Sequence, residues 1–255
     1  MKQLPNLFTL LNLFFGCCAI VFALQNGITV SFDPEKGSQL VILPEEMWFA
    51  SFFIALAAVI DFLDGFVARL MGATSGMGQQ LDSLADVVSF GVAPSLIVYQ
   101  FLRLSYARQE EGLEISWIWL SPAFIIACAA AYRLAKFNLD AGQQYGFKGM
   151  PTPAIGLLVA SFPLIYWHSD NDSIIQLMVN KWVWYAMVLL LTYLMVSSLP
   201  MLSLKFKDFS VKNNWSKFLL ALIAIAAAVL LKWMAVPVVF IAYIAVSLSL
   251  KKRTT

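Results

Sequence analysis

Long apolar stretches run through the whole sequence and restrict what this chain can fold into. A helix that crosses a bilayer needs about 20 mostly apolar residues. The sequence is 60% hydrophobic and only 13% charged, so charges cannot cover its surface as they do in a water-soluble protein. We therefore predict an all-α integral membrane protein with about eight transmembrane helices. The candidate helices are residues 7–24, 47–71, 77–104, 115–137, 153–167, 182–204, 218–231 and 234–250.

A single membrane domain over residues 1–255 is expected, because the sequence contains no repeat and no linker-like segment. The first apolar stretch lacks a small-residue cleavage site after a short apolar region, so we interpret it as a membrane helix. The last two candidates are separated only by Lys232 and Trp233, which predicts a tight hairpin. The number of helices after residue 205 stays open.

Basic residues are distributed unevenly among the segments that join these helices. If the N-terminus is cytoplasmic, most of the 17 lysine and arginine residues fall on the cytoplasmic side, while most of the 15 acidic residues fall outside. Basic residues concentrate in cytoplasmic loops of membrane proteins. The charge pattern therefore predicts a multi-pass protein with both termini in the cytoplasm, in a bacterial inner membrane or another cell membrane.

Four aspartates lie inside two of the predicted helices. Asp61 and Asp64 are three residues apart, and Asp82 and Asp86 are four apart, so each pair shares a helix face. A turn of small and polar residues at 72–76 separates the two helices and makes them antiparallel neighbours. All four carboxylates can therefore converge a few helical turns from the cytoplasmic face.

Ionised carboxylates are costly inside a membrane, and such groups are functional by default. Oxygen ligands without histidine or cysteine suit Mg²⁺, Mn²⁺ or Ca²⁺, and Mg²⁺ readily takes phosphate oxygens as further ligands. Gly65 and Gly78 leave room for a ligand, Ala68 keeps the helix face shallow, and Arg69 can pair with phosphate. The pattern predicts a metal site that binds a nucleotide diphosphate and opens to the cytoplasm.

The spacing Asp-Gly-x2-Ala-Arg-x8-Gly-x3-Asp-x3-Asp, from Asp64 to Asp86, resembles the signature of the CDP-alcohol phosphatidyltransferase family. Asp61 completes its longer form. The resemblance covers roughly the first six helices and implies a six-helix core followed by a C-terminal pair. It further implies two divalent metal ions held by the four aspartates, Asp86 as the general base, and a homodimer. The residues that it implies for CDP binding are Asp64, Gly65, Ala68, Arg69 and Gly78.

Further segments resemble one branch of this family, the membrane-embedded phosphatidylserine synthases. These segments are residues 4–13, 86–94, 133–138 and 147–153, in the same order along the chain. The resemblance implies that the phosphatidyl group of CDP-diacylglycerol is transferred to L-serine, giving phosphatidylserine and CMP. Glycerol 3-phosphate, inositol phosphate and choline are the alternative acceptors.

Three residues near the cytoplasmic end of the fourth predicted helix are candidates for binding the acceptor or the lipid phosphate. Arg133 and Asn138 lie at the depth of the aspartates, and Lys148 follows in the next loop. Arg133 can pair with the carboxylate of serine, or it can extend to the interface and contact lipid phosphate. Both interpretations stay open.

Two other classes of protein fit part of the pattern. A membrane prenyltransferase also binds a diphosphate through aspartates and Mg²⁺, but its two aspartate-rich motifs lie far apart, whereas both pairs here fall within residues 61–86. A divalent-cation or proton transporter would need neither Gly65 nor Arg69. Membrane lipids are expected partners, and nucleic acid is not.

Overall fold

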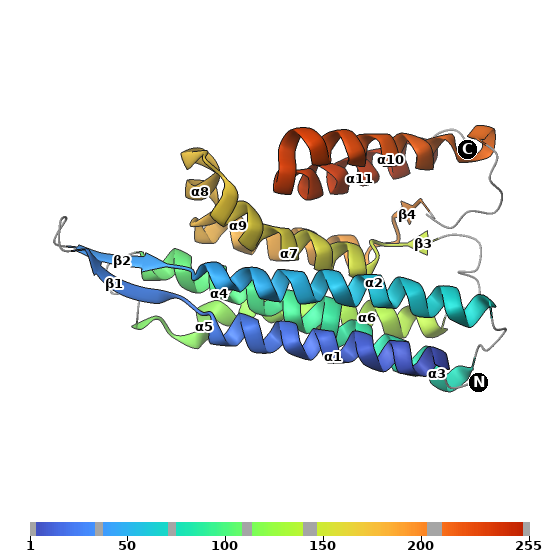
Figure 1. The fold of residues 1–255 in the computed structure, drawn as a ribbon, viewed down its shortest axis with the longest axis horizontal. Helices are drawn as coiled ribbons and strands as arrows, with labels where there is room; N and C mark the ends of the chain where they lie inside the picture. Colours follow the sequence, from blue (N-terminus) through green and yellow to red (C-terminus); the bar gives the residue numbers. More distant parts are fainter. Residues whose placement is uncertain are drawn as a thin grey trace.

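The computed structural model is a bundle of long helices with two small antiparallel sheets, one of β1 (Thr29–Asp33) and β2 (Ser38–Ile42) and one of β3 (Phe147–Lys148) and β4 (Pro200–Met201) (Figure 1). It describes residues 4–33, 38–70, 75–108, 114–139, 147–202 and 211–251. The N-terminal half contributes α1 (Leu4–Gln25), α2 (Trp48–Leu70), α3 (Gly76–Val87), a π-helix η2 (Val88–Val92), α4 (Ala93–Ala107), α5 (Trp117–Leu120), η4 (Ser121–Phe124) and α6 (Ile125–Leu139). The C-terminal half contributes α7 (Thr152–His168), α8 (Asp172–Met178), α9 (Lys181–Val196), α10 (Val211–Leu231), η6 (Lys232–Met234) and α11 (Ala235–Lys251).

The predicted all-α membrane fold is confirmed, and the number of spanning helices is approximate. Five helical segments of the described chain are long and apolar enough to cross a membrane, or six if the bent pair α8–α9 counts as one span. Each of the eight predicted stretches is helical for most of its length. The difference arises because α7 has only 17 residues and because α10 and α11, joined through η6, count as one apolar segment although they lie side by side, as the predicted hairpin requires (Figure 1).

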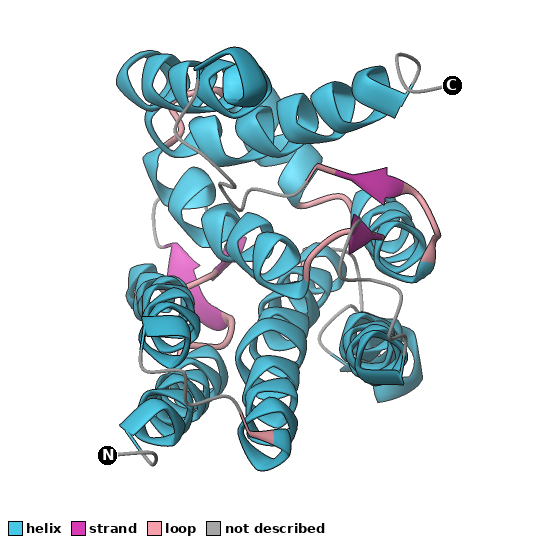
Figure 2. Cartoon of the chain, turned by 90° about the vertical axis from the view of Figure 1, so that its right-hand side faces the viewer, coloured by secondary structure: helices cyan, strands magenta, loops and turns pink. Residues whose placement is uncertain are grey.

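The two ends of the bundle carry different elements. The start of α1, the start of α3 and the end of α11 lie at one end, where both chain termini are found, whereas α8 and the β1–β2 hairpin lie at the other (Figure 1). Seen from the end with the termini, α10 and α11 pack at one side of the bundle (Figure 2). This arrangement agrees with the predicted alternation of the helices across the membrane.

The continuous helix from Gly76 to Ala107 lies at the centre of the fold. In the most apolar 18-residue stretch of this helix 61% of the residues are buried, compared with 28% in the corresponding stretches of α1 and α2. Because large apolar side chains such as Leu7, Phe14 and Phe62 are exposed on the outer helices, the bundle presents them to its surroundings, as expected in lipid. Most of the buried residues of this segment lie in η2 and α4, whereas in the aspartate-bearing helix α3 only Ala85 and Asp86 are buried.

One predicted boundary is wrong. The sixth helix was expected to reach residue 204, but α9 ends at Val196, and Pro200–Met201 form β4, which pairs with β3 (Phe147–Lys148). Pro200 has no backbone N–H, and it disfavours a helical conformation at the residue before it. The helix therefore ends early, and the chain continues as a short strand beside β3.

The antiparallel hairpin of β1 (Thr29–Asp33) and β2 (Ser38–Ile42) was not predicted. The Pro-Glu-Lys-Gly sequence between α1 and α2 is polar and typical of a turn or loop. The residues before this turn-like sequence alternate between polar and apolar types, as in Thr-Val-Ser-Phe, which is the usual pattern of a strand. The residues after it, Ser-Gln-Leu-Val-Ile, do not alternate, so the signal for a hairpin is present on one side only.

Candidate active site

Three aspartates come together where α2 lies beside α3. One carboxylate oxygen from each of Asp61, Asp64 and Asp82 lies within 4.8 Å of the others. Asp64 is buried, and the other two are half-buried. The short connection after α2 makes the two helices antiparallel, and the hydroxyl of Ser75 accepts a hydrogen bond from Gly78 N at 3.0 Å, which caps the start of α3. The predicted convergence of these three carboxylates is therefore present in the structure.

The donor set of this group suits a divalent metal ion. All three ligands are carboxylates, which are preferred by Mg²⁺ and Mn²⁺. Oδ1 of Asp82 is buried and has no hydrogen-bond partner among the described residues. A buried carboxylate oxygen without a partner is unfavourable, and a coordinated cation would satisfy it. The residues therefore fit the metal that the sequence implies.

Asp86 lies one helical turn beyond Asp82 and is more deeply buried, with 6% of its surface exposed. It is not a member of the three-carboxylate group. Its charge nevertheless interacts with those of Asp61 and Asp82, so it borders the same site. The π-helix η2 begins two residues later, and π-helical turns are often found at functional sites. Asp86 is thus placed beside the group at greater depth.

Two residues of α1 contact the aspartates, and neither is among the predicted site residues. The Thr9 hydroxyl donates a hydrogen bond to Asp64 Oδ2 at 2.5 Å, and Asn12 Nδ2 donates to Asp86 Oδ1 at 3.4 Å. The available signal was the presence of polar side chains at helical spacing in an otherwise apolar helix. Residues 4–13 resemble a segment of the phosphatidylserine synthases, but that resemblance implies no role for either residue.

The remaining signature residues lie on the same two helices. Gly65 and Ala68 are half-buried on α2, and Arg69 lies on the last turn of that helix, but its side chain is outside the described residues. A Cβ atom at Gly78 would lie 3.1 Å from Asn6 Oδ1 and 3.1 Å from Ser75 Oγ. The start of α3 therefore comes close to α1 at this glycine.

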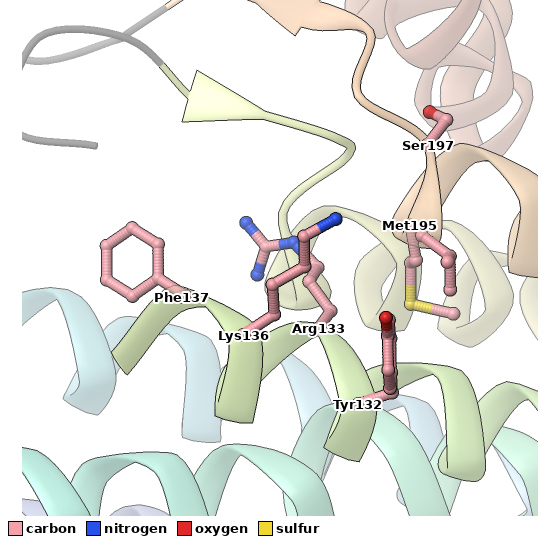
Figure 3. A pocket seen from close by; sticks show the side chains of 7 residues that line it. Tyr132, Arg133, Lys136, Phe137, Met195 and Ser197 are labelled. Atoms are coloured by element: carbon pink, nitrogen blue, oxygen red, sulfur yellow. The ribbon is translucent and has the colours of Figure 1, made fainter. Parts of the chain in front are cut away.

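Arg133 lies on α6 and points into the molecule. Only 8% of its surface is exposed, and its charge interacts with that of Asp86. Its Nε atom is buried without a hydrogen-bond partner in the described part of the chain. Arg133 also lines a pocket beside Lys136 and Ser197 (Figure 3). This burial differs from that of an arginine that extends outwards to lipid headgroups.

Asn138 connects α6 to the aspartate-bearing helix. Its Oδ1 accepts a hydrogen bond from Gln79 Nε2 at 3.1 Å, and its Nδ2 donates to Ser83 Oγ at 2.8 Å. Both ends of the amide are therefore engaged with α3, on either side of Asp82. Lys148 lies in β3, and its side chain is outside the described residues.

Comparison with known proteins identifies the class of enzyme. The family model for CDP-alcohol phosphatidyltransferases matches residues 2–183, which include α1 to α8 and the whole aspartate motif. The chain therefore belongs to the CDP-alcohol phosphatidyltransferase family. This membership leaves the prenyltransferase and transporter interpretations without support. The helices α10 and α11 lie beyond the matched residues.

Individual relatives point to one branch of that family. A CDP-diacylglycerol–serine O-phosphatidyltransferase of Helicobacter pylori is 32% identical over 221 residues, covering 86% of this chain and 78% of the relative. An enzyme of the same name from Mycobacterium tuberculosis is 34% identical over 259 residues, covering 95% and 76%. An archaetidylserine synthase of Methanothermobacter thermautotrophicus is 27% identical over 172 residues, covering 67% and 61%.

Proposed function

We propose that this chain transfers the phosphatidyl group of CDP-diacylglycerol to the hydroxyl of L-serine and releases CMP. The observation that carries the proposal is the convergence of Asp61, Asp64 and Asp82, which stand at signature positions, within 4.8 Å. The acceptor is inferred from the relatives, since the names of the bacterial and archaeal enzymes all specify a serine product or substrate.

We propose that Asp61, Asp64, Asp82 and Asp86 together hold two divalent ions, Mg²⁺ or Mn²⁺. Such ions would neutralise the pyrophosphate of the CDP-lipid and the charge that develops on it during transfer. Gly65, Ala68 and Gly78 border the space for the nucleotide. Arg69 contributes a positive charge that suits a phosphate oxygen.

Asp86 is proposed to act as the general base. A carboxylate oxygen of Asp86 accepts the proton of the serine hydroxyl. At the same time the hydroxyl oxygen of serine attacks the phosphorus bonded to diacylglycerol. The bond between this phosphorus and the oxygen of CMP breaks, and CMP leaves. The depth of Asp86 supports this role, because it is the most buried of the four aspartates and the lipid substrate enters from the membrane. No protein nucleophile is needed for direct transfer.

We further propose that Arg133 pairs with the serine carboxylate. Its guanidinium is buried, its charge interacts with that of Asp86, and it lines a pocket with Lys136. These contacts favour the acceptor over a headgroup at the membrane surface. Asn138 then holds α6 against α3, and Lys148 stays a candidate for the lipid phosphate. The cytoplasmic position of the site and a homodimeric assembly are part of the same proposal, on the basis of the charge pattern and the family resemblance.

The proposal is tested by measuring CMP release from CDP-diacylglycerol by the purified chain in detergent with Mg²⁺ or Mn²⁺. The acceptors are L-serine, glycerol 3-phosphate, inositol phosphate and none. We expect release that depends on serine, and a decrease in kcat of about 10²- to 10⁴-fold for Asp86→Asn. Asp170→Asn, an exposed aspartate at the opposite end of the bundle, is the matched control and retains activity.

Each other outcome has a distinct meaning. Release with a different acceptor would retain the family chemistry and overturn serine as the substrate. Full activity of Asp86→Asn would overturn its role as the base. Release that does not change when the metal is chelated would contradict the proposed metal site.

A further inference from the structure

The buried residues of α1 form one stripe along its length. Every third or fourth residue is buried, and all of these are small or polar. The stripe consists of Pro5, Thr9, Asn12, Gly16, Ala19 and Ala23. The large apolar residues of the same helix, such as Leu7 and Phe14, are exposed at 65% and 59%. This helix therefore turns its least apolar face towards the bundle, which indicates a specific requirement on that face.

The two polar members of the stripe contact the aspartates from different helices. Thr9, which is 4% exposed, donates to Asp64 on α2, and Asn12, which is fully buried, donates to Asp86 on α3. A carboxylate that accepts a hydrogen bond from a fixed donor has fewer orientations available. α1 thus provides one residue to orient the aspartate of α2 and another to orient the aspartate of α3.

The position of α1 along its axis is fixed by a close approach to the π-helix η2. A Cβ atom at Gly16 would lie 2.3 Å from Ser89 Oγ and 2.9 Å from Ser89 Cα, so a larger residue cannot occupy this place without displacement. The Ser89 hydroxyl also donates to the carbonyl oxygen of Asn12 at 3.1 Å. These contacts hold Asn12 in register with the residues that follow Asp86.

The amide of Asn12 is not explained by packing. Its Oδ1 is buried without a hydrogen-bond partner among the described residues, which is unfavourable in an apolar environment. A leucine has the same number of side-chain heavy atoms, branches at the same carbon and leaves no oxygen unpaired. The donor group facing Asp86 is the feature of Asn12 that leucine lacks.

We propose that Thr9 and Asn12 are positioning residues for the reaction, each orienting one aspartate of the site through a single hydrogen bond. Thr9 orients Asp64 for metal binding, and Asn12 orients Asp86 towards the acceptor. The inference rests on the proposed function for its effect on kcat. Its effect on metal binding does not depend on which acceptor is used.

The test compares Thr9→Val and Asn12→Leu, which remove the donors, with Thr9→Ser, which retains a hydroxyl. Ser161→Ala is the matched control, because Ser161 is also buried but its hydroxyl donates only to Leu158 O on its own helix. We expect kcat for CMP release to fall about 10- to 100-fold in Thr9→Val and Asn12→Leu, since a hydrogen bond to a charged group is lost. The KM for each substrate and the unfolding temperature should match those of Ser161→Ala, and Thr9→Ser should recover most of the activity.

A second readout separates this inference from the proposed function. The increase in unfolding temperature on adding Mn²⁺ is measured for each variant without substrate. Thr9→Val is expected to need a higher Mn²⁺ concentration for the same increase, even if the wild-type chain releases no CMP with any acceptor. Equal metal dependence and equal kcat in the wild type and both donor-free variants would overturn the inference. So would a Thr9→Ser variant as impaired as Thr9→Val, because that result indicates a packing role.

Discussion

Asp64, Asp86 and Arg133 are the charged side chains that this fold buries, within the part of the chain that the structure describes. They come from three different helices, and the charge of Arg133 interacts with that of Asp86. Ionisable groups inside a membrane bundle generally pair with one another or with a ligand. The buried positive charge therefore balances part of the negative charge of the aspartates and leaves room for cations.

Replacing Arg133 distinguishes its two possible substrates. We expect Arg133→Gln to raise the KM for serine by about 10- to 100-fold, because a charged hydrogen-bond donor to a carboxylate is lost. The KM for CDP-diacylglycerol should change little. Steady-state CMP release with each substrate varied in turn gives both values. A rise confined to the KM for the CDP-lipid would instead assign Arg133 to the lipid phosphate. Arg108→Gln, which lies beyond α4 at the other end of the bundle, is the control.

At the scale of single elements, three helices approach the π-helix η2 closely. Gly16 of α1 meets Ser89, Gly91 of the π-helix meets Ala130 of α6, and Gly156 of α7 meets Phe90. At each contact one partner has no side chain, so the backbones can come close together. The π-helix begins two residues after Asp86, so this packing also fixes the depth of the proposed base.

Enlarging the glycine of α7 should disturb this packing. A Cβ atom at Gly156 would lie 2.9 Å from Phe90 Cδ1 and 3.2 Å from Phe90 Cα, and Phe90 is fully buried. We expect Gly156→Ala to lower the free energy of unfolding by about 1–3 kcal/mol through overpacking. Gly76→Ala is the matched control, since a Cβ there meets nothing within 4 Å. Thermal unfolding in detergent measures both variants, and equal unfolding temperatures would contradict the expectation.

The elements differ in how far the sequence could predict them. The long apolar helices follow from hydropathy alone, and the aspartate pairs follow from their spacing within those helices. The early end of α9 depends on Pro200 and on pairing with β3, which lies about 50 residues earlier in the chain. The roles of Thr9 and Asn12 depend on contacts with residues 55 and 74 positions away, which a single sequence does not specify.

At the scale of the whole molecule, the C-terminal pair α10–α11 is attached to the bundle through a short strand. The Tyr243 hydroxyl donates to Leu202 O at 2.9 Å, and Leu202 N donates to Ser247 Oγ at 3.1 Å. Both backbone groups of Leu202, next to β4, are thus held by α11. The helices beyond the matched family residues are therefore fixed to the segment at the end of β4.

The orientation of the whole molecule can be measured with introduced cysteines. We expect Asp170→Cys to react with a membrane-impermeant maleimide in intact cells, because it lies at the end predicted to face outwards. Gly76→Cys, at the end that carries both termini, should react only after the membrane is opened. The wild-type chain is the blank, since Cys17, Cys18 and Cys128 lie within α1 and α6. The reverse labelling pattern would overturn the cytoplasmic placement of the site.

The contacts of α1 also bear on the order in which the protein is synthesised. Asn12 is made 74 residues before its partner Asp86, an interval of about 4–15 s at ordinary rates of translation. During that time the first helix resides in the membrane without the bundle that later covers its polar face. A neutral hydroxyl and a neutral amide are tolerated there far better than a carboxylate would be. The charged partners, Asp64 and Asp86, are synthesised later, on the next two helices. The uncharged residue of each contact therefore enters the lipid before its charged partner.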